Sequence, residues 1–142
     1  MAQNVVVDSG PIVAWLNVRD THHEWAKQEF ERLKPPLLTC EAVLTEAAFL
    51  VQRSGGNPAT VLALCVKGVL RVAISLQDEA AHLERLTRRY NSVPMSIADA
   101  CLVRLSEIVD DVRVMTFDTD FRVYRRKRRQ LIPSLAPASV DR

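Results

Sequence analysis

Paired cysteines, glycine-rich segments and long apolar runs are missing from this 142-residue chain, and their absence narrows the class of protein. The three cysteines, Cys40, Cys65 and Cys101, stand far apart with no C-x-x-C spacing, which argues against a disulfide framework or a zinc knuckle. No apolar segment is long enough to span a bilayer, and the opening Met-Ala-Gln-Asn has no basic stretch of the signal-peptide kind. We therefore expect a soluble protein of the reducing cytoplasm that has no membrane segment.

What the chain does have is an alternation of short β-branched runs with amphipathic stretches. Its length suits one domain, and 48% of its residues are hydrophobic, which is enough for a core. Strands that alternate with helices predict an α/β fold with a mostly parallel sheet of four or five strands, covered on both faces. We expect this domain to span residues 1–134, with a possible edge strand at 130–133, and residues 135–142 to form a loosely held tail. The other strands are predicted at residues 4–7, 37–39, 70–74 and 112–117.

Two carboxylates directly follow predicted strands. Asp8 closes the run of three valines at 5–7, and Pro11 suits the first turn of a following helix. Asp118 follows the strand at 112–117. Right-handed crossovers bring the ends of successive parallel strands to one edge of the sheet, which is where ligands bind in open α/β folds. A turn or a helix cap would explain each residue by itself.

Two further acids lie on predicted helices. Glu46 stands at the centre of the apolar face of a buried helix over residues 40–53, where a lone carboxylate is costly unless something binds it. An ion pair with Arg53 and a ligand role explain Glu46 equally well. Asp99 lies in the first turn of the helix that begins at Ser96, and this S-x-x-D pattern is typical of a capping box. The alternative is that Asp99 projects toward the edge of the sheet.

Taken together, the four acids form a set with little counter-charge, because it contains no lysine and Arg53 is the one nearby cation. Clustered carboxylates repel one another, so they must be protonated, paired with cations or bound to metal. An all-oxygen donor set favours Mg²⁺ or Mn²⁺ over zinc, and two such ions can activate a water and stabilise a leaving oxygen. The hydroxyls of Ser9 and Thr116 flank two of the acids and would support the carboxylates or a metal-bound water.

The net charge of +2 conceals a basic segment near the C-terminus that contains six positive residues and no acid. The rest of the chain therefore carries a net charge of −4. Fifteen of the nineteen basic residues are arginine, the better bidentate partner for phosphate. The segment is either a solvated surface or a contact for an anionic partner such as RNA. Its basic residues are Arg122, Arg125, Arg126, Lys127, Arg128 and Arg129.

Four short motifs follow one another over nearly the whole chain: Val7-Asp8-Ser9 with Pro11, Leu44-Thr45-Glu46-Ala47, Ser96-Ile97-Ala98-Asp99-Ala100 and Thr116-Phe117-Asp118-Thr119-Asp120-Phe121. In this order they resemble the motifs of the PIN-domain ribonucleases found as toxins of VapBC toxin–antitoxin pairs. The resemblance implies a single-domain, Rossmann-like α/β/α sandwich, a divalent-metal site and cleavage of RNA. It also implies that Asp8, Glu46, Asp99 and Asp118 form the acidic set, with Asp120 at a less uniform fifth position.

The leading hypothesis is thus a Mg²⁺-dependent endoribonuclease of the cytoplasm. In it Asp8, Asp99 and Asp118 ligate metal, and Glu46 ligates metal or orients the attacking water. By the same resemblance the chain would be a homodimeric toxin with a VapB-like antitoxin partner. A non-cleaving module that binds RNA or protein is the main alternative. A metal-dependent phosphatase is weaker, because the D-x-D pattern at 118–120 follows the fourth strand rather than the first.

Overall fold

The computed structural model describes residues 3–140 and contains a five-stranded sheet in the order β3-β2-β1-β4-β7. Every neighbouring pair of strands in this sheet is parallel. The predicted α/β class and the mostly parallel sheet are therefore confirmed. The strands of this sheet are β1 (Asn4–Val7), β2 (Leu37–Thr39), β3 (Leu70–Val72), β4 (Val112–Met115) and β7 (Ser134–Leu135).

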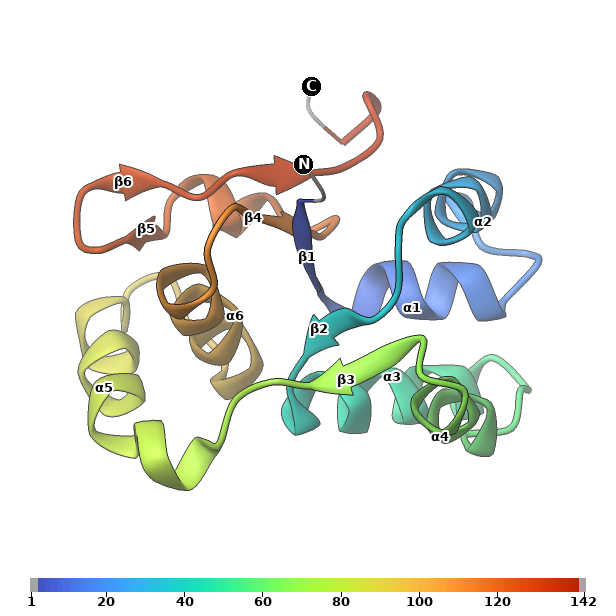
Figure 1. Ribbon diagram of the computed structural model, residues 1–142, viewed down its shortest axis with the longest axis horizontal. Helices are drawn as coiled ribbons and strands as arrows, with labels where there is room; N and C mark the ends of the chain where they lie inside the picture. Colours follow the sequence, from blue (N-terminus) through green and yellow to red (C-terminus); the bar gives the residue numbers. More distant parts are fainter. Residues whose placement is uncertain (1–2, 141–142) are drawn as a thin grey trace.

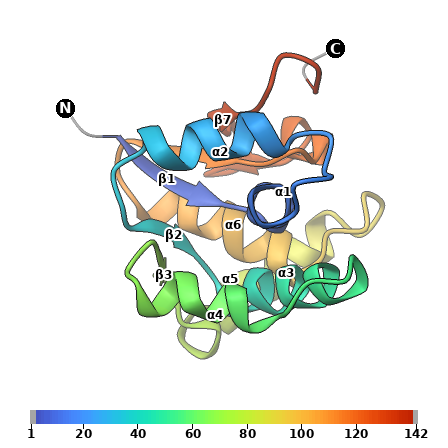
Figure 2. The ribbon, with the colours of Figure 1, turned by 90° about the vertical axis from the view of Figure 1, so that its right-hand side faces the viewer.

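Helices cover both faces of the sheet. In Figure 1, α5 and α6 lie to the left of the central strand β1, and α1 and α2 lie to its right. Figure 2 looks onto the second face, with α1, α2 and α4 in front of the strands. This is the expected α/β/α sandwich. The helices are α1 (Ser9–Leu16), α2 (His23–Arg32), α3 (Glu41–Arg53), α4 (Ala59–Val66), α5 (Leu76–Arg89) and α6 (Ile97–Ile108).

The two central strands of the sheet, β1 and β4, contribute to the core of the molecule. Val6 and Val7 of β1 are fully buried, and so are Val114 and Met115 of the neighbouring strand β4. Two strands with no exposed face are expected where helices pack on both sides of a parallel sheet. The register pairs Val7 with Met115, so the chain leaves both strands at the same edge. Asp8 and Thr116 are consequently neighbours.

The C-terminal part of the sheet differs in detail from the sequence prediction. The single edge strand expected at 130–133 is replaced by two short strands. Gln130–Leu131 forms β6, which pairs with β5 (Arg125–Arg126) in a separate antiparallel hairpin, and β7 supplies the fifth strand of the main sheet. Leu135, the first residue of the segment predicted as a tail, pairs with Met115 and is buried. The ordered sheet thus extends one residue into that segment.

No helix within residues 3–140 is both long enough and apolar enough to cross a membrane.

Candidate active site

Asp8 is held where β1 ends and α1 begins. Its backbone N–H donates to the carbonyl of Met115 on β4 at 3.0 Å, which continues the sheet by one step. Its carboxylate accepts a 2.8 Å hydrogen bond from the backbone N–H of Ser9 and a 2.7 Å bond from Thr116 Oγ1. The residue is only 8% exposed. Asp8 is therefore a fixed, buried carboxylate at the N-terminus of a helix, where negative charge is favoured.

The environment of Asp8 raises its pKa from 3.8 to about 6. Burial is the main cause, and the negative charges of Asp99 and Glu46 add to it, whereas the hydrogen bonds from Thr116 and Ser9 lower the pKa. No basic side chain is among the groups that shift it. Within residues 3–140, this buried carboxylate forms no ion pair with a lysine, arginine or histidine.

Glu46 lies at the border of the same site but is exposed to solvent. The prediction that it occupies the centre of the core-facing side of its helix is wrong, because the buried stripe of α3 is formed by Val43, Ala47 and Val51. Glu46 stands beside that stripe, close enough to α1 for its Oε1 to accept a 3.0 Å hydrogen bond from Ser9 Oγ. The proposed ion pair with Arg53 is also wrong, since the Arg53 guanidinium lies over the Phe49 ring, 5.8 Å from its centroid.

Asp99 combines the two roles that its sequence position left open. Its backbone N–H donates to Ser96 Oγ at 3.0 Å, and its Oδ2 accepts from the Ser96 N–H at 3.4 Å, which completes a capping box at the start of α6. The same Oδ2 accepts a 3.0 Å hydrogen bond from the hydroxyl of Tyr124. Burial and, to a smaller extent, the charge of Asp118 raise the pKa of Asp99. Asp99 therefore caps the helix and faces the other acids.

Asp118 and Asp120 lie on the short turn that follows β4. Asp118 is exposed, and its Oδ1 accepts a 2.9 Å hydrogen bond from the N–H of Asp120 at the start of the 3₁₀ helix Thr119–Arg122. Its own N–H donates to Thr116 Oγ1 at 3.0 Å. Asp120 is half-buried, and its charge adds to those of Asp99 and Asp118 in raising the pKa of Tyr124. Both acids therefore border the space next to Asp99.

Two hydroxyls connect these acids. Ser9 lies between Asp8 and Glu46, since its N–H donates to the first and its Oγ to the second. Thr116 lies between Asp8 and Asp118, donating its hydroxyl proton to Asp8 and accepting from the Asp118 N–H. The side chains predicted as supporting residues are thus in contact with the acids, and both are buried.

The acids form a set of hard oxygen donors, which suits a divalent cation. Within residues 3–140, no three acidic, histidine or cysteine side chains are already gathered closely enough to enclose an ion. The carboxylates are nevertheless close enough to repel one another: besides burial, the charges of Asp99 and Glu46 raise the pKa of Asp8, and that of Asp118 raises the pKa of Asp99. The residue types therefore fit a divalent cation by their chemistry.

The basic segment runs away from the acids along α6. The Arg126 Nε donates to the carbonyl of Ser106 at 2.8 Å, and the Lys127 N–H donates to Glu107 near the far end of this helix. Since a helix rises 1.5 Å per residue, Glu107 lies about 12 Å from Asp99 along α6. Three of the predicted RNA-binding arginines already bond protein carbonyls, whereas Lys127, Arg128 and Arg129 are exposed. The three are Arg122, Arg125 and Arg126.

Sequence reasoning missed Tyr124. This side chain is fully buried beneath the basic segment, packs edge-on against Tyr90 and Phe121, and points its hydroxyl at Asp99. Nothing in its spacing marked it, because it is separated from Asp99 by 25 residues and by a strand and a turn. The one feature of the sequence that could have pointed to Tyr124 is its position as an aromatic residue within the arginine-rich segment.

The protein is an α/β/α sandwich that carries a set of carboxylates at the C-terminal edge of its parallel sheet. The sequence profile of the PIN domain matches residues 5–127, and the chain belongs to the PIN-domain family. Members of this family generally use divalent metal ions.

Among solved structures, the chain is similar to Mycobacterium tuberculosis VapC20, which is described as a toxin that cleaves the sarcin-ricin loop. The two superpose with a TM-score of 0.72 over 84% of this chain and 94% of that chain, at 24% sequence identity. This likeness confirms the fold. No curated protein sequence matches the chain significantly.

Proposed function

We propose that this chain is a Mg²⁺-dependent endoribonuclease and that it acts as the toxin of a type II toxin–antitoxin pair. The observation that carries the proposal is the buried, unbalanced carboxylate of Asp8 beside three further acids at the edge of the sheet. Membership of the PIN family and the similarity to an RNA-cleaving toxin both support it.

In this proposal Asp8, Asp99 and Asp118 hold the metal, and Asp120 extends the set. Asp8 and Asp99 suit a permanent ligand role because hydrogen bonds from Ser9, Thr116 and Tyr124 fix their carboxylates. Bound Mg²⁺ would supply a Lewis acid for the phosphodiester and lower the pKa of a water.

Glu46 is suited to a different task. It is exposed, and Ser9 Oγ donates to its Oε1, so its Oε2 is suited to orient a water or to accept its proton. In the cleavage step the water oxygen would bond to phosphorus while the bond between phosphorus and a bridging oxygen breaks. Glu46 would take a proton from the attacking water, and the leaving oxygen would take up a proton from solvent.

Cleavage of RNA by the purified protein in Mg²⁺, and in EDTA as a control, tests the proposal directly. We expect Asp99→Asn to lose at least a hundredfold in rate while keeping its fold, because the amide oxygen of asparagine can still accept from the Ser96 N–H of the capping box. The matched control is Asp110→Asn, an exposed acid outside the site. Full metal-dependent cleavage by Asp99→Asn would overturn the site assignment. RNA binding by the wild type without any cleavage would favour the regulatory alternative.

The toxin role adds a partner, a VapB-like antitoxin, and a homodimeric state. Expression should arrest growth, Asp99→Asn should not, and co-expression of a small reading frame next to the gene should restore growth. Sedimentation of the purified chain alone tests the homodimer. Growth arrest that persists in Asp99→Asn would separate the toxic effect from RNA cleavage and contradict this role.

A further inference from the structure

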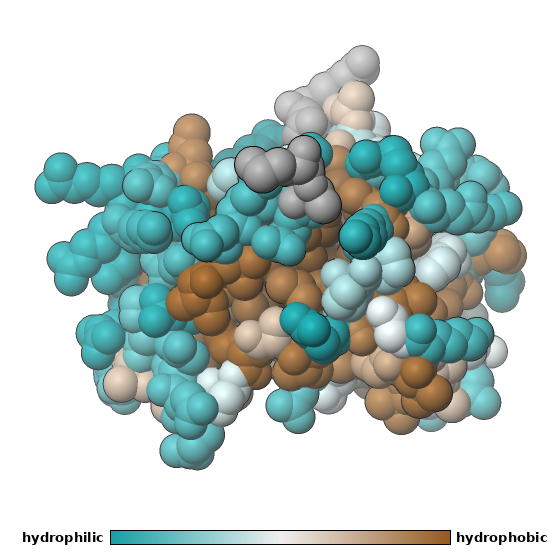
Figure 3. Space-filling view, in the orientation of Figure 1, coloured by the Kyte–Doolittle hydropathy of each residue, from teal (hydrophilic) through white to brown (hydrophobic). Residues whose placement is uncertain are grey.

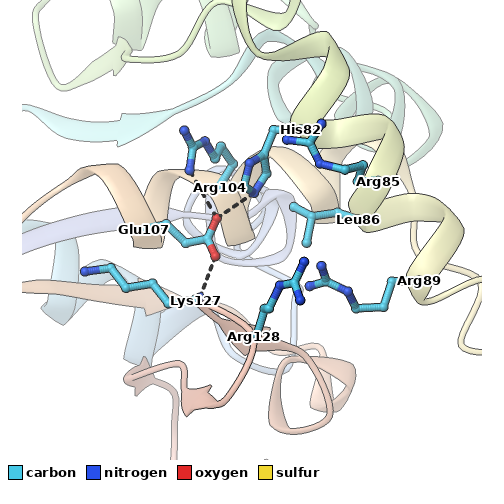
Figure 4. A pocket seen from close by; sticks show the side chains of 8 residues that line it. All are labelled: His82, Arg85, Leu86, Arg89, Arg104, Glu107, Lys127 and Arg128. Carbon is cyan, nitrogen blue, oxygen red and sulfur yellow. Dashed lines mark hydrogen bonds and ion pairs between the residues drawn. The ribbon is translucent and has the colours of Figure 1, made fainter.

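A second concave site lies between α5, the C-terminal half of α6 and the turn of the β5–β6 hairpin. It has a volume of about 350 Å³, and its lining is rich in basic side chains: Arg85 and Arg89 from α5, Arg104 from α6, and Lys127 and Arg128 from the turn (Figure 4). Figure 3 shows hydrophilic side chains gathered over this part of the molecule, at the left edge of the view. We call it the basic pocket.

Part of the positive charge in the basic pocket is balanced within the protein. Glu107 is the one acid in the lining, and only 6% of its side chain is exposed. It accepts from His82 Nε2 at 3.0 Å, from Arg104 at 3.4 Å and from the Lys127 N–H. Arg104 also donates to Glu79 at 2.7 Å. Arg104 is therefore shared between two carboxylates, Glu79 and Glu107, and its charge is balanced within the protein.

The remaining charge is not balanced. Among residues 3–140, no carboxylate pairs with the side chains of Arg85, Arg89 or Arg128. In Figure 4 the guanidinium groups of Arg89 and Arg128 point toward each other across the pocket. Two guanidinium groups that face each other repel unless an anion lies between them. The pocket thus has the charge and shape of an anion site.

The backbone of the hairpin turn supports a binding role. Lys127 has a φ of 49° and Arg128 a φ of 72°, the left-handed region that hairpin turns usually fill with asparagine or glycine. Placing two long basic side chains there costs backbone energy and directs Arg128 over the pocket. Strained turns of this kind are concentrated at ligand-binding sites.

We propose that the basic pocket binds a backbone phosphate of the RNA substrate, an inference that rests on the proposed function. The planar fork of arginine matches the paired oxygens of a phosphate, and two such forks suit a single tetrahedral group. Glu107 lies about 12 Å along α6 from Asp99. The phosphate bound in the basic pocket would therefore belong to a different nucleotide from the one that is cleaved.

The test measures binding of a fluorescent 12-nucleotide single-stranded RNA to the full chain in EDTA, so that cleavage does not interfere. The pocket variant is Arg89→Gln with Arg128→Gln, which keeps the side-chain stems. The charge-matched control is Arg19→Gln with Arg71→Gln, two exposed arginines elsewhere on the surface.

We expect the pocket variant to bind roughly tenfold more weakly at low salt and the control to change little. The slope of log affinity against log salt should fall by about 0.7 in the pocket variant, the value for one phosphate contact with a single strand. Lysine at both positions should restore part of the affinity, since it keeps the charge but not the fork. Equal weakening in the pocket variant and the control would overturn the proposal, because it would indicate bulk charge alone.

Two competitors test the identity of the anion. If an oligoglutamate peptide binds the wild type more tightly than RNA of equal charge and does not bind the pocket variant, the ligand of the basic pocket is an acidic protein segment and not RNA. If pyrophosphate binds at the pocket and the affinity for RNA does not depend on the pocket arginines, the ligand is a small phosphate compound and not RNA. Either result would contradict the proposal. Because binding is measured without metal, its failure leaves the cleavage result untouched, and a chain that cannot cleave RNA still gives a binding result.

Discussion

Asp8 should destabilise the metal-free protein at neutral pH, so replacing it with asparagine should increase stability. Its pKa is about 6 in the folded protein, against 3.8 for an ordinary aspartate. The folded state therefore holds the proton more tightly than the unfolded chain does, and stability is lost as pH rises through this interval. At 1.36 kcal/mol per pKa unit, the full cost above pH 7 is about 3 kcal/mol.

Asparagine has nearly the shape of a protonated Asp8 side chain and can keep most of its contacts. Its Oδ1 can accept from the Ser9 N–H, as the Asp8 carboxylate does. Its amide N–H can donate to Thr116 Oγ1, so that Thr116 becomes the acceptor of this hydrogen bond instead of the donor. The gain should be about 3 kcal/mol at pH 8, about 1.5 kcal/mol at pH 5 and about 0.5 kcal/mol at pH 4, because the wild-type carboxylate protonates over that range.

Urea unfolding in EDTA at these pH values measures the difference between the two proteins. Asp110→Asn, an exposed acid, serves as the control and should stay within about 0.5 kcal/mol of the wild type at every pH. A gain for Asp8→Asn that does not depend on pH, or a loss of stability at pH 8, would refute the electrostatic reasoning.

Metal should act on the same carboxylate. Mg²⁺ at ten times its dissociation constant should stabilise the wild type by about 1.4 kcal/mol, and the shift in melting temperature should be much smaller in Asp8→Asn. An equal shift in both proteins would indicate that Mg²⁺ binds elsewhere.

Two other changes give clear expectations. Tyr124→Phe removes the hydroxyl that donates to Asp99. Urea unfolding should show a loss of about 1–2 kcal/mol in the free energy of unfolding, and the rate of RNA cleavage should fall although Asp99 is still present. Unchanged cleavage would show that this hydrogen bond does not position the carboxylate. Leu102→Ala empties a fully buried position on α6 and should cost about 2–5 kcal/mol in the same assay, with a loss below 1 kcal/mol contradicting the described packing.

One helix, α6, connects the two sites proposed for this protein. The acids lie at the beginning of α6 and the basic pocket near its end, so one helix sets the distance between the proposed cleavage site and the proposed phosphate contact. A rigid spacer of this kind would favour RNA whose backbone reaches both sites at once.

The sequence by itself determined the α/β class and the positions of Asp8 and Asp118. Both depend on local information, because short β-branched runs predict strands and an acid that follows a strand lies near its carboxyl end. Asp8 directly follows β1, whereas β4 ends at Met115, two residues earlier than predicted, and Asp118 lies on the turn beyond it. The capping box of Asp99 could likewise be predicted from the sequence, because it involves residues only three positions apart.

Tertiary structure decided the rest. Glu46 looked buried on a helical wheel, yet α3 buries the stripe of Val43, Ala47 and Val51 and leaves Glu46 at the solvent border beside Ser9. The buried face of a helix depends on which neighbours pack against it, and its own sequence does not specify them. The same reason explains Tyr124 and the facing guanidinium groups of Arg89 and Arg128: each pair of partners is joined only by the packing of elements that are distant in the chain.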